Sequence, residues 1–80
     1  MKTTKYFDHV RKRPDRAIIT EVWIIEVIDN AIETRIQDDG RIKKWAFIKD
    51  AEKYLRVILL EDGETVHNAF FDRGYTETGK

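Results

Sequence analysis

Cysteine is absent from this 80-residue sequence, and histidine occurs only twice. Without cysteine the chain can form neither a disulfide nor a thiolate metal site, and two histidines argue against a histidine-built zinc site. The four glycines form no phosphate-binding loop, and neither a metal-ligand spacing nor a nucleophile-elbow motif occurs. The sequence therefore predicts no metal and no cofactor.

Long apolar runs are missing as well. The longest, Val22–Ile25 and Val57–Leu60, are far too short to cross a bilayer. The chain starts with polar residues, Lys2 to Lys5 after Met1, which is unlike a secretory signal. Hydrophobic residues make up 41% of the chain, enough for one modest core. We expect a single domain over residues 1–80 that works in the cytoplasm and does not contact a membrane.

A net charge of one sign is also lacking, because 15 basic residues balance 15 acidic ones. This balance excludes a globally basic nucleic-acid-binding protein. The charges nevertheless come in blocks, with net values of +4 for residues 1–16, −4 for 17–34, +3 for 35–56 and −3 for 57–80. Two basic blocks allow a local cationic face. The alternative interpretation is that each charged run is simply a solvated surface.

Helical signals come first along the chain. The segment Tyr6–Arg13 fits either a short helix or an irregular strand that ends at Pro14. Thr20 is suited to cap a helix that runs to about Asn30, because its hydroxyl can accept a hydrogen bond from a free backbone N–H. This helix is apolar nearly all round, so we expect it to be well buried. The side chains expected to point inward are Val22, Ile25, Ile24, Val27 and Ile28.

Strand signals follow, with a period of two from Ile32 onward. Asp39-Gly40 and Asp62-Gly63 are typical two-residue hairpin turns. They separate strands expected over residues 32–37, 41–48, 53–61 and 65–72, with a loop at 49–52 and a frayed tail from Gly74. The predicted fold class is α+β, in which one or two N-terminal helices pack on a four-strand antiparallel meander.

Two-residue turns also predict the pairing of side chains across strands. They place Thr34 opposite Trp45 and Val57 opposite Asn68, and a continuous apolar face requires Trp45 opposite Val57. The helix-covered face then collects Ile32, Thr34, Ile36, Trp45, Phe47, Leu55, Val57, Leu59, Val66, Asn68 and Phe70. The other face collects Arg35, Lys44, Tyr54, Arg56, Ile58, His67, Ala69, Phe71 and Arg73.

Three strings of residues resemble a known family. They are YFDHVRKRPDR (Tyr6 to Arg16), TEVWIIEVI (Thr20 to Ile28) and KYLRVILLEDGETVHNAFFDRGY (Lys53 to Tyr75), and together they cover a little over half the chain. The layout resembles the small toxins of type II toxin–antitoxin modules, in the BrnT-like branch of the RelE/ParE superfamily. It also resembles a group of small bacterial proteins that end in HNAFFDR, present here as His67 to Arg73.

The resemblance implies a RelE-like fold, metal-independent cleavage of RNA and a cognate antitoxin as protein partner, with free RNA or the ribosome as the target. Cleavage of this kind uses the ribose 2′-hydroxyl as nucleophile, and it needs a base, an acid and cations at the phosphate. His67 suits the acid or base, Arg56 and Arg73 suit the phosphate, and His9 is a second catalytic candidate. The candidates for holding the substrate are Arg35, Lys44, Tyr54, Phe71, Arg11 and Arg13.

Each candidate also has a purely structural interpretation. His67 fits a cross-strand packing role, and Arg56 fits a surface ion pair with an acidic neighbour. Tyr54 and Phe71 fit a second small apolar cluster. The basic neighbours of His9 fit a solvated arm. A non-catalytic binding module, which uses the sheet face or the sheet edge to hold a protein partner, is therefore the alternative functional hypothesis.

Overall fold

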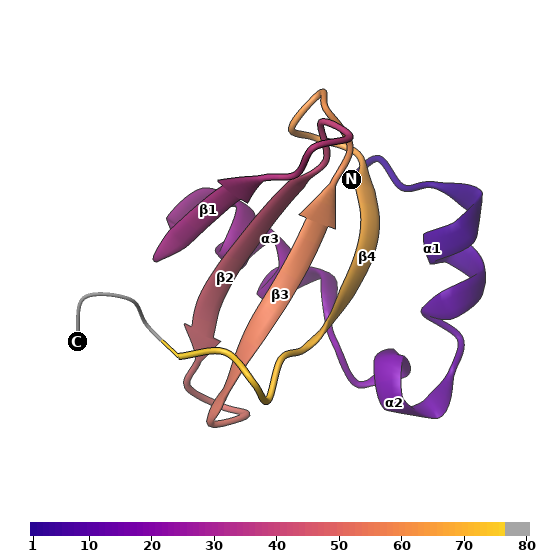
Figure 1. Ribbon diagram of the computed structural model, residues 1–80. Helices are drawn as coiled ribbons and strands as arrows, with labels where there is room; N and C mark the ends of the chain where they lie inside the picture. The colour runs from indigo at the N-terminus through magenta and orange to yellow at the C-terminus, as the bar shows by residue number, and fades with distance from the viewer. Residues whose placement is uncertain (77–80) are drawn as a thin grey trace.

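Three helices precede four strands in the computed structural model, which describes residues 1–76 (Figure 1). The helices are α1 (Lys5–Val10), α2 (Pro14–Ala17) and α3 (Glu21–Asn30), and the strands are β1 (Glu33–Ile36), β2 (Ile42–Ile48), β3 (Lys53–Leu59) and β4 (Val66–Phe71). The sheet order is β1-β2-β3-β4, and each neighbouring pair is antiparallel. The predicted α+β class with a four-strand meander is confirmed. No helix within residues 1–76 is long and apolar enough to span a membrane.

Threonine hydroxyls begin the two longer helices. The Thr4 side chain accepts a hydrogen bond from the Phe7 N–H at 3.1 Å, and Thr20 accepts one from Trp23 N–H at 3.1 Å. Pro14 begins α2, where its fixed φ suits the first helical turn and its missing N–H costs nothing. The ambiguous segment before Pro14 is therefore helical, and the predicted bounds of the third helix are confirmed.

Helix α3 buries only one stripe of its apolar surface. Ile24 and Val27 are fully buried against the sheet, while Val22 is 74% exposed and Ile25 is 45% exposed. The expectation that Val22 and Ile25 point inward is wrong, as is the expectation of a well-buried helix. The reason is geometric: α3 covers one face of the sheet, and α1 and α2 lie beside β4, so no element covers its outer side (Figure 1).

The first hairpin has a three-residue loop, which changes the expected register. Gln37 N–H donates to Arg41 C=O at 2.8 Å, and Gly40 between them has φ of +89°, the left-handed conformation of a bulged three-residue turn. Trp45 therefore pairs with Glu33, and the predicted pairing with Thr34 is wrong by one residue. A one-residue shift turns a whole strand over. On β2, Ala46 and Ile48 face α3, whereas Trp45 and Phe47 occupy the opposite face.

The second hairpin begins in the expected register and then changes it. Leu59 pairs with Val66, as the two-residue turn predicts, but a bulge follows and Ile58 pairs with Asn68. His67 is the extra residue in that bulge. Beyond it, Asn68 and Phe70 lie on the face away from α3, and Ala69 and Phe71 lie on the α3 side, which reverses the prediction for all four residues.

The core lies between α3 and the sheet. Leu55, Val57 and Leu59 of β3 are fully buried there, as predicted. They pack with Ile24 and Val27 of α3 and with Phe7 of α1. Lys2 C=O accepts from Val66 N–H at 2.8 Å, and Thr4 N–H donates to Val66 C=O at 3.0 Å. These bonds cover the outer edge of β4 at Val66, where the strand begins.

The chain crosses the uncovered face of the sheet after β4 (Figure 1). Tyr75, which is predicted to lie in a frayed tail, instead stacks on the Trp45 ring with centroids 5.1 Å apart. Its hydroxyl donates to Glu33 Oε1 at 2.6 Å. Residues 77–80 of the predicted frayed tail lie outside the described residues.

Candidate functional site

Arginine side chains alternate with aromatic rings across the sheet face that α3 does not cover, which we call the exposed sheet face. Arg56 Cζ lies 5.3 Å from the Trp45 ring centroid and 5.0 Å from that of Phe70. At the two ends of this set, Arg35 Cζ lies 5.2 Å from the Trp45 ring centroid and Arg16 Cζ lies 5.2 Å from the Phe70 ring centroid. These are cation–π distances. We call the five residues the arginine–aromatic row.

The strand register builds this row. Trp45 on β2 is directly opposite Arg56 on β3, and Arg56 is directly opposite Phe70 on β4, so the three side chains stand side by side. Arg16 reaches the row from α2. It donates to Asn68 Oδ1 at 2.7 Å and pairs with Asp15 at 3.5 Å.

Asp72, just after β4, fixes the centre of the row. One of its oxygens, Oδ2, accepts from Trp45 Nε1 at 3.0 Å and from Arg56 Nη2 at 2.6 Å. Burial alone would raise the pKa of Asp72, but the hydrogen bonds from Trp45 and Arg56 outweigh it, so the pKa lies below its ordinary value. Arg56 therefore already has an ionised partner, and its guanidinium lies between the Trp45 and Phe70 rings.

Trp45 is only 2% exposed because neighbouring side chains cover it. The Tyr75 ring lies nearly parallel to it, at an interplanar angle of 17°. Tyr54 contacts Tyr75 edge to face with centroids 5.0 Å apart, and Phe47 contacts Tyr54 in the same way at 5.2 Å. The aromatic surface that a ligand can reach directly therefore lies at Phe70 and around Tyr54, on either side of Trp45.

His67 lies in the β4 bulge and faces the start of α1. Its Nδ1 is 3.1 Å from Thr4 Oγ1, and its ring stacks on Tyr6 with centroids 4.9 Å apart. Burial lowers the pKa of His67 below its ordinary value, and the positive charge of Arg41 lowers it further, although Asp39 acts in the opposite direction. The imidazole is therefore neutral near pH 7, the form that accepts a proton.

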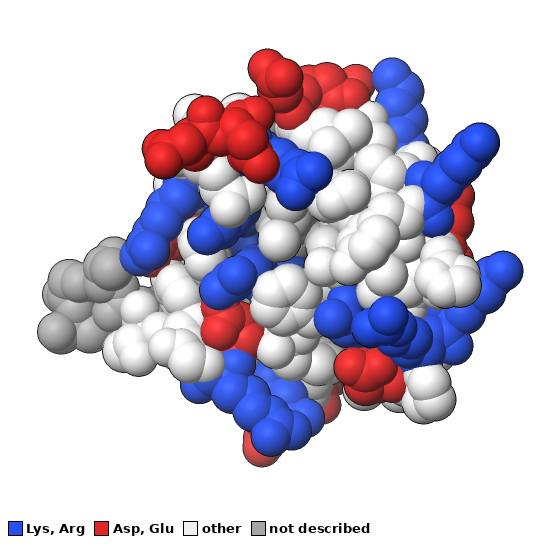
Figure 2. All heavy atoms as spheres, turned by 45° about the vertical axis from the view of Figure 1, so that its right-hand side comes forward, with Lys and Arg blue, Asp and Glu red and all other residues white. Residues whose placement is uncertain are grey.

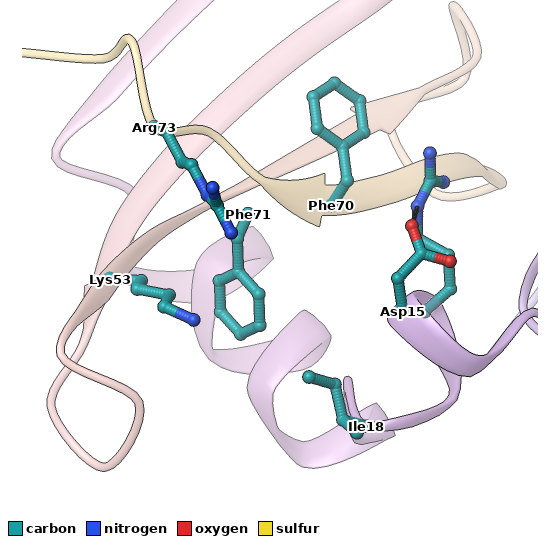
Figure 3. Close-up of a pocket in the computed structure, with 7 residues that line it drawn as sticks. Asp15, Ile18, Lys53, Phe70, Phe71 and Arg73 are labelled. Atoms are coloured by element: carbon teal, nitrogen blue, oxygen red, sulfur yellow. Dashed lines mark ion pairs between the residues drawn. The ribbon is translucent and has the colours of Figure 1, made fainter.

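Two hollows meet at the end of the sheet where β3 begins and β4 ends. The first has a volume of about 310 Å³ and lies between α2 and β4, with Phe70 and Phe71 in its wall. The second, of about 420 Å³, lies toward Tyr54 and Tyr75. Both are lined by Lys53, Phe71 and Arg73, which lie together on one side of the first hollow (Figure 3). We call the pair of hollows the Lys53–Arg73 cleft.

Charge is separated along the sheet. Figure 2 shows Lys and Arg side chains over the exposed sheet face and around its β4 edge, while acidic side chains gather at the end with the two hairpin turns. Those turns contain Asp38, Asp39, Glu61, Asp62 and Glu64. A cationic area therefore coincides with the row and the cleft, although the chain is neutral overall.

The structure does not bring all predicted site residues together. It places Arg35, Tyr54 and Arg56 on the exposed sheet face and Arg73 at the cleft. Lys44 lies on the opposite face, where its Nζ donates to Ile28 C=O at 2.9 Å, so the prediction for Lys44 is wrong because β2 is turned over. Phe71 likewise packs against Trp23 and the core from the α3 side, although its ring also lines the cleft, where Lys53 Nζ lies 5.3 Å from its centroid.

The basic N-terminal residues also lie apart from the row. Arg11, at the end of α1, lies 5.1 Å from the Phe7 ring centroid and pairs with Glu21 at 3.2 Å. Arg13 precedes α2 and is exposed, and His9 is exposed on α1. Within residues 1–76, no group of three or more histidine, aspartate or glutamate side chains is arranged to hold a metal ion.

Sequence reasoning missed Arg16, Trp45, Phe70, Asp72 and Lys53 as site residues. A three-residue interpretation of the Asp38-Asp39-Gly40 loop would have placed Trp45 correctly. No local signal marks the bulge that exposes Phe70, nor the contacts that Arg16 and Asp72 make from outside the sheet.

Comparison of the chain with protein-family models finds no match, and comparisons with curated proteins and with solved structures also find none.

Proposed function

We propose that this chain binds single-stranded RNA across its exposed sheet face. The arginine–aromatic row supports this proposal. Single-stranded RNA is bound by stacking of unpaired bases on aromatic rings and on guanidinium planes, while cations follow the phosphates. The row offers both surfaces in alternation over four strands and α2, and the cleft continues it at the β4 edge.

We further propose that the bound RNA is cleaved without a metal, as the resemblance to RelE/ParE toxins implies. His67 supplies the base: its neutral imidazole takes the proton from the 2′-hydroxyl, the 2′-oxygen attacks the adjacent phosphorus, and the bond from phosphorus to the 5′-oxygen of the next nucleotide breaks. The products are a 2′,3′-cyclic phosphate and a 5′-hydroxyl, whose proton comes from water. Arg16, which is hydrogen-bonded to Asn68 next to His67, neutralises the charge that develops on the phosphoryl oxygens. Lys53 and Arg73 lie at the other end of β4, about 20 Å along the strand, and bind another phosphate of the same RNA. In this role the chain acts in the bacterial cytoplasm, and an antitoxin is its protein partner.

Cleavage in excess EDTA, with and without ribosomes, tests this function. We expect His67→Gln to lower the cleavage rate at least about 100-fold, because a positioned acid or base contributes that much. Glutamine can still hydrogen-bond Thr4 but cannot exchange a proton near pH 7. RNA binding and thermal stability should change little. Lys12→Ala, which removes an exposed charge from the turn between α1 and α2, should cleave normally. Full activity of a folded His67→Gln variant would contradict the proposed role.

A non-catalytic binding module for a protein partner is the second candidate. The observation that favours it is an uncovered apolar surface on and before α3, where Ile18, Val22 and Ile25 are 57%, 74% and 45% exposed. This surface lies on the helix and not on the sheet face or edge. No cleavage by the folded protein under any of the conditions above would favour this second function.

A further inference from the structure

The Lys53–Arg73 cleft has two cations without an acidic partner. Among the described residues, neither Lys53 nor Arg73 forms an ion pair, unlike Arg16, Arg35 and Arg56. Both side chains are exposed and line both hollows. A single anionic group placed between the hollows would therefore meet two positive charges that no side chain already neutralises.

Aromatic rings form the walls on either side of these cations. In the first hollow Phe70 and Phe71 stand beside Arg16, whose guanidinium covers the Phe70 ring. In the second hollow the rings of Tyr54 and Tyr75 contact each other edge to face. The acidic residues there are Asp15 and Asp72, which are paired with Arg16 and Arg56, and Glu52. Each hollow thus has an aromatic wall next to positive charge, and in the first hollow Lys53 Nζ lies 5.3 Å from the Phe71 ring centroid.

The size of the hollows limits what fits. Volumes of about 310 and 420 Å³ lie at the small end of the range for ligand sites, which begins at roughly 300 Å³. Each hollow is therefore suited to one flat group and not to an extended ligand. An acidic peptide would satisfy the cations, but it would leave two aromatic walls without flat partners.

We propose that the Lys53–Arg73 cleft binds a dinucleotide step of single-stranded RNA, with the phosphate between Lys53 and Arg73 and one base in each hollow. This proposal rests on the RNA function proposed above and names the part of the substrate that the β4 edge holds. Arg16 and Phe70 belong both to the row and to the first hollow, so the strand continues from the cleft onto the exposed sheet face.

Titration of the labelled full-length protein with adenylyl-(3′→5′)-adenosine, followed by NMR, tests the proposal. We expect the amides of Lys53, Phe71, Arg73 and Tyr75 to shift, and adenosine or inorganic phosphate alone to bind at least about tenfold more weakly. Lys53→Ala and Arg73→Ala should each weaken binding about tenfold, as loss of a charge-assisted hydrogen bond does. Lys12→Ala, which removes an exposed charge outside the cleft, should not change it.

The outcomes separate the cleft from the wider function when a 12-nucleotide single-stranded RNA is titrated in parallel. Phosphate binding as tight as that of the dinucleotide would overturn the proposal in favour of a simple anion site. Unchanged dinucleotide binding by Lys53→Ala and Arg73→Ala would also overturn it, and if the longer RNA still binds, the RNA function would stand without the cleft. Dinucleotide binding at the cleft with no binding of the longer RNA would support the cleft and contradict the RNA function.

Discussion

Asp72→Ala is expected to lower the free energy of unfolding by about 3 kcal/mol, or roughly 12–24 °C in melting temperature for a domain of this size. Asp72 accepts hydrogen bonds from Trp45 and Arg56. The side chain of Asp72 is only 12% exposed, and that of Arg56 is 25% exposed. Without the carboxylate, Arg56 would remain as a largely buried charge with no counter-ion. Urea denaturation at pH 7 measures the loss, and the indole of Trp45 should become more exposed to water.

The loss should also depend on pH with a definite sign. The pKa of Asp72 is lower in the folded protein than its ordinary value of about 3.9 in an unfolded chain. Its stabilising contribution is therefore complete above about pH 4 and disappears as the pH falls through the lower folded pKa. Asp50→Ala, which removes an exposed carboxylate from the β2–β3 turn, is the matched control. Equal stability of the two variants at pH 7 would show that Asp72 does not hold the row together.

Phe70→Ala is expected to weaken binding of single-stranded RNA by about tenfold or more, because one base stacked on an aromatic ring is worth about 1–3 kcal/mol. Its effect should be the same at every salt concentration, since no charge is removed. Arg16→Gln should instead reduce the slope of log affinity against log salt by about 1, as expected for one lost phosphate contact. The two variants therefore separate stacking from charge within one row.

Val22→Ala provides the apolar control for this comparison. Val22 is 74% exposed on the outer side of α3, away from the exposed sheet face and the cleft. Its loss should leave RNA affinity unchanged. An equal loss from Val22→Ala and Phe70→Ala would indicate non-specific hydrophobic contact, and would contradict binding along the row. Melting temperatures of both variants show whether either loss comes from unfolding.

Most elements of the fold could be predicted because their signals are local. Thr20 caps α3 as the sequence indicates, and the two Asp-Gly turns separate strands at the expected places. The sheet face that each β2 side chain occupies was harder to predict, because both faces of this strand are apolar. Trp45 and Phe47 alternate with Ala46 and Ile48, so periodicity alone does not show which pair faces α3. The length of the first hairpin loop sets the register. Interpreting Asp39-Gly40 as a two-residue turn places the side chains of β2 on the wrong faces of the sheet.

The candidate site depended on the tertiary structure to a greater degree. Arg35, Tyr54 and Arg56 lie on the predicted face because β1 and β3 were oriented correctly. Phe70 lies on this face only because of the bulge at His67, and no turn residue in the sequence indicates that bulge. Arg16 and Asp72 lie outside the strands, and their positions follow from how α2 and the C-terminal segment pack on β4. Such contacts join residues far apart in the sequence, so local patterns carry no information about them.

Crosslinking tests most directly whether the exposed sheet face is where RNA binds. Single-stranded RNA containing 4-thiouridine is bound to the folded protein and irradiated, and the attached residues are identified by mass spectrometry. We predict attachment at Phe70 and Tyr54, on either side of the covered Trp45 ring, and its loss when unlabelled RNA competes. Attachment confined to the outer side of α3, around Val22 and Ile25, or no competed attachment at all, would contradict the account.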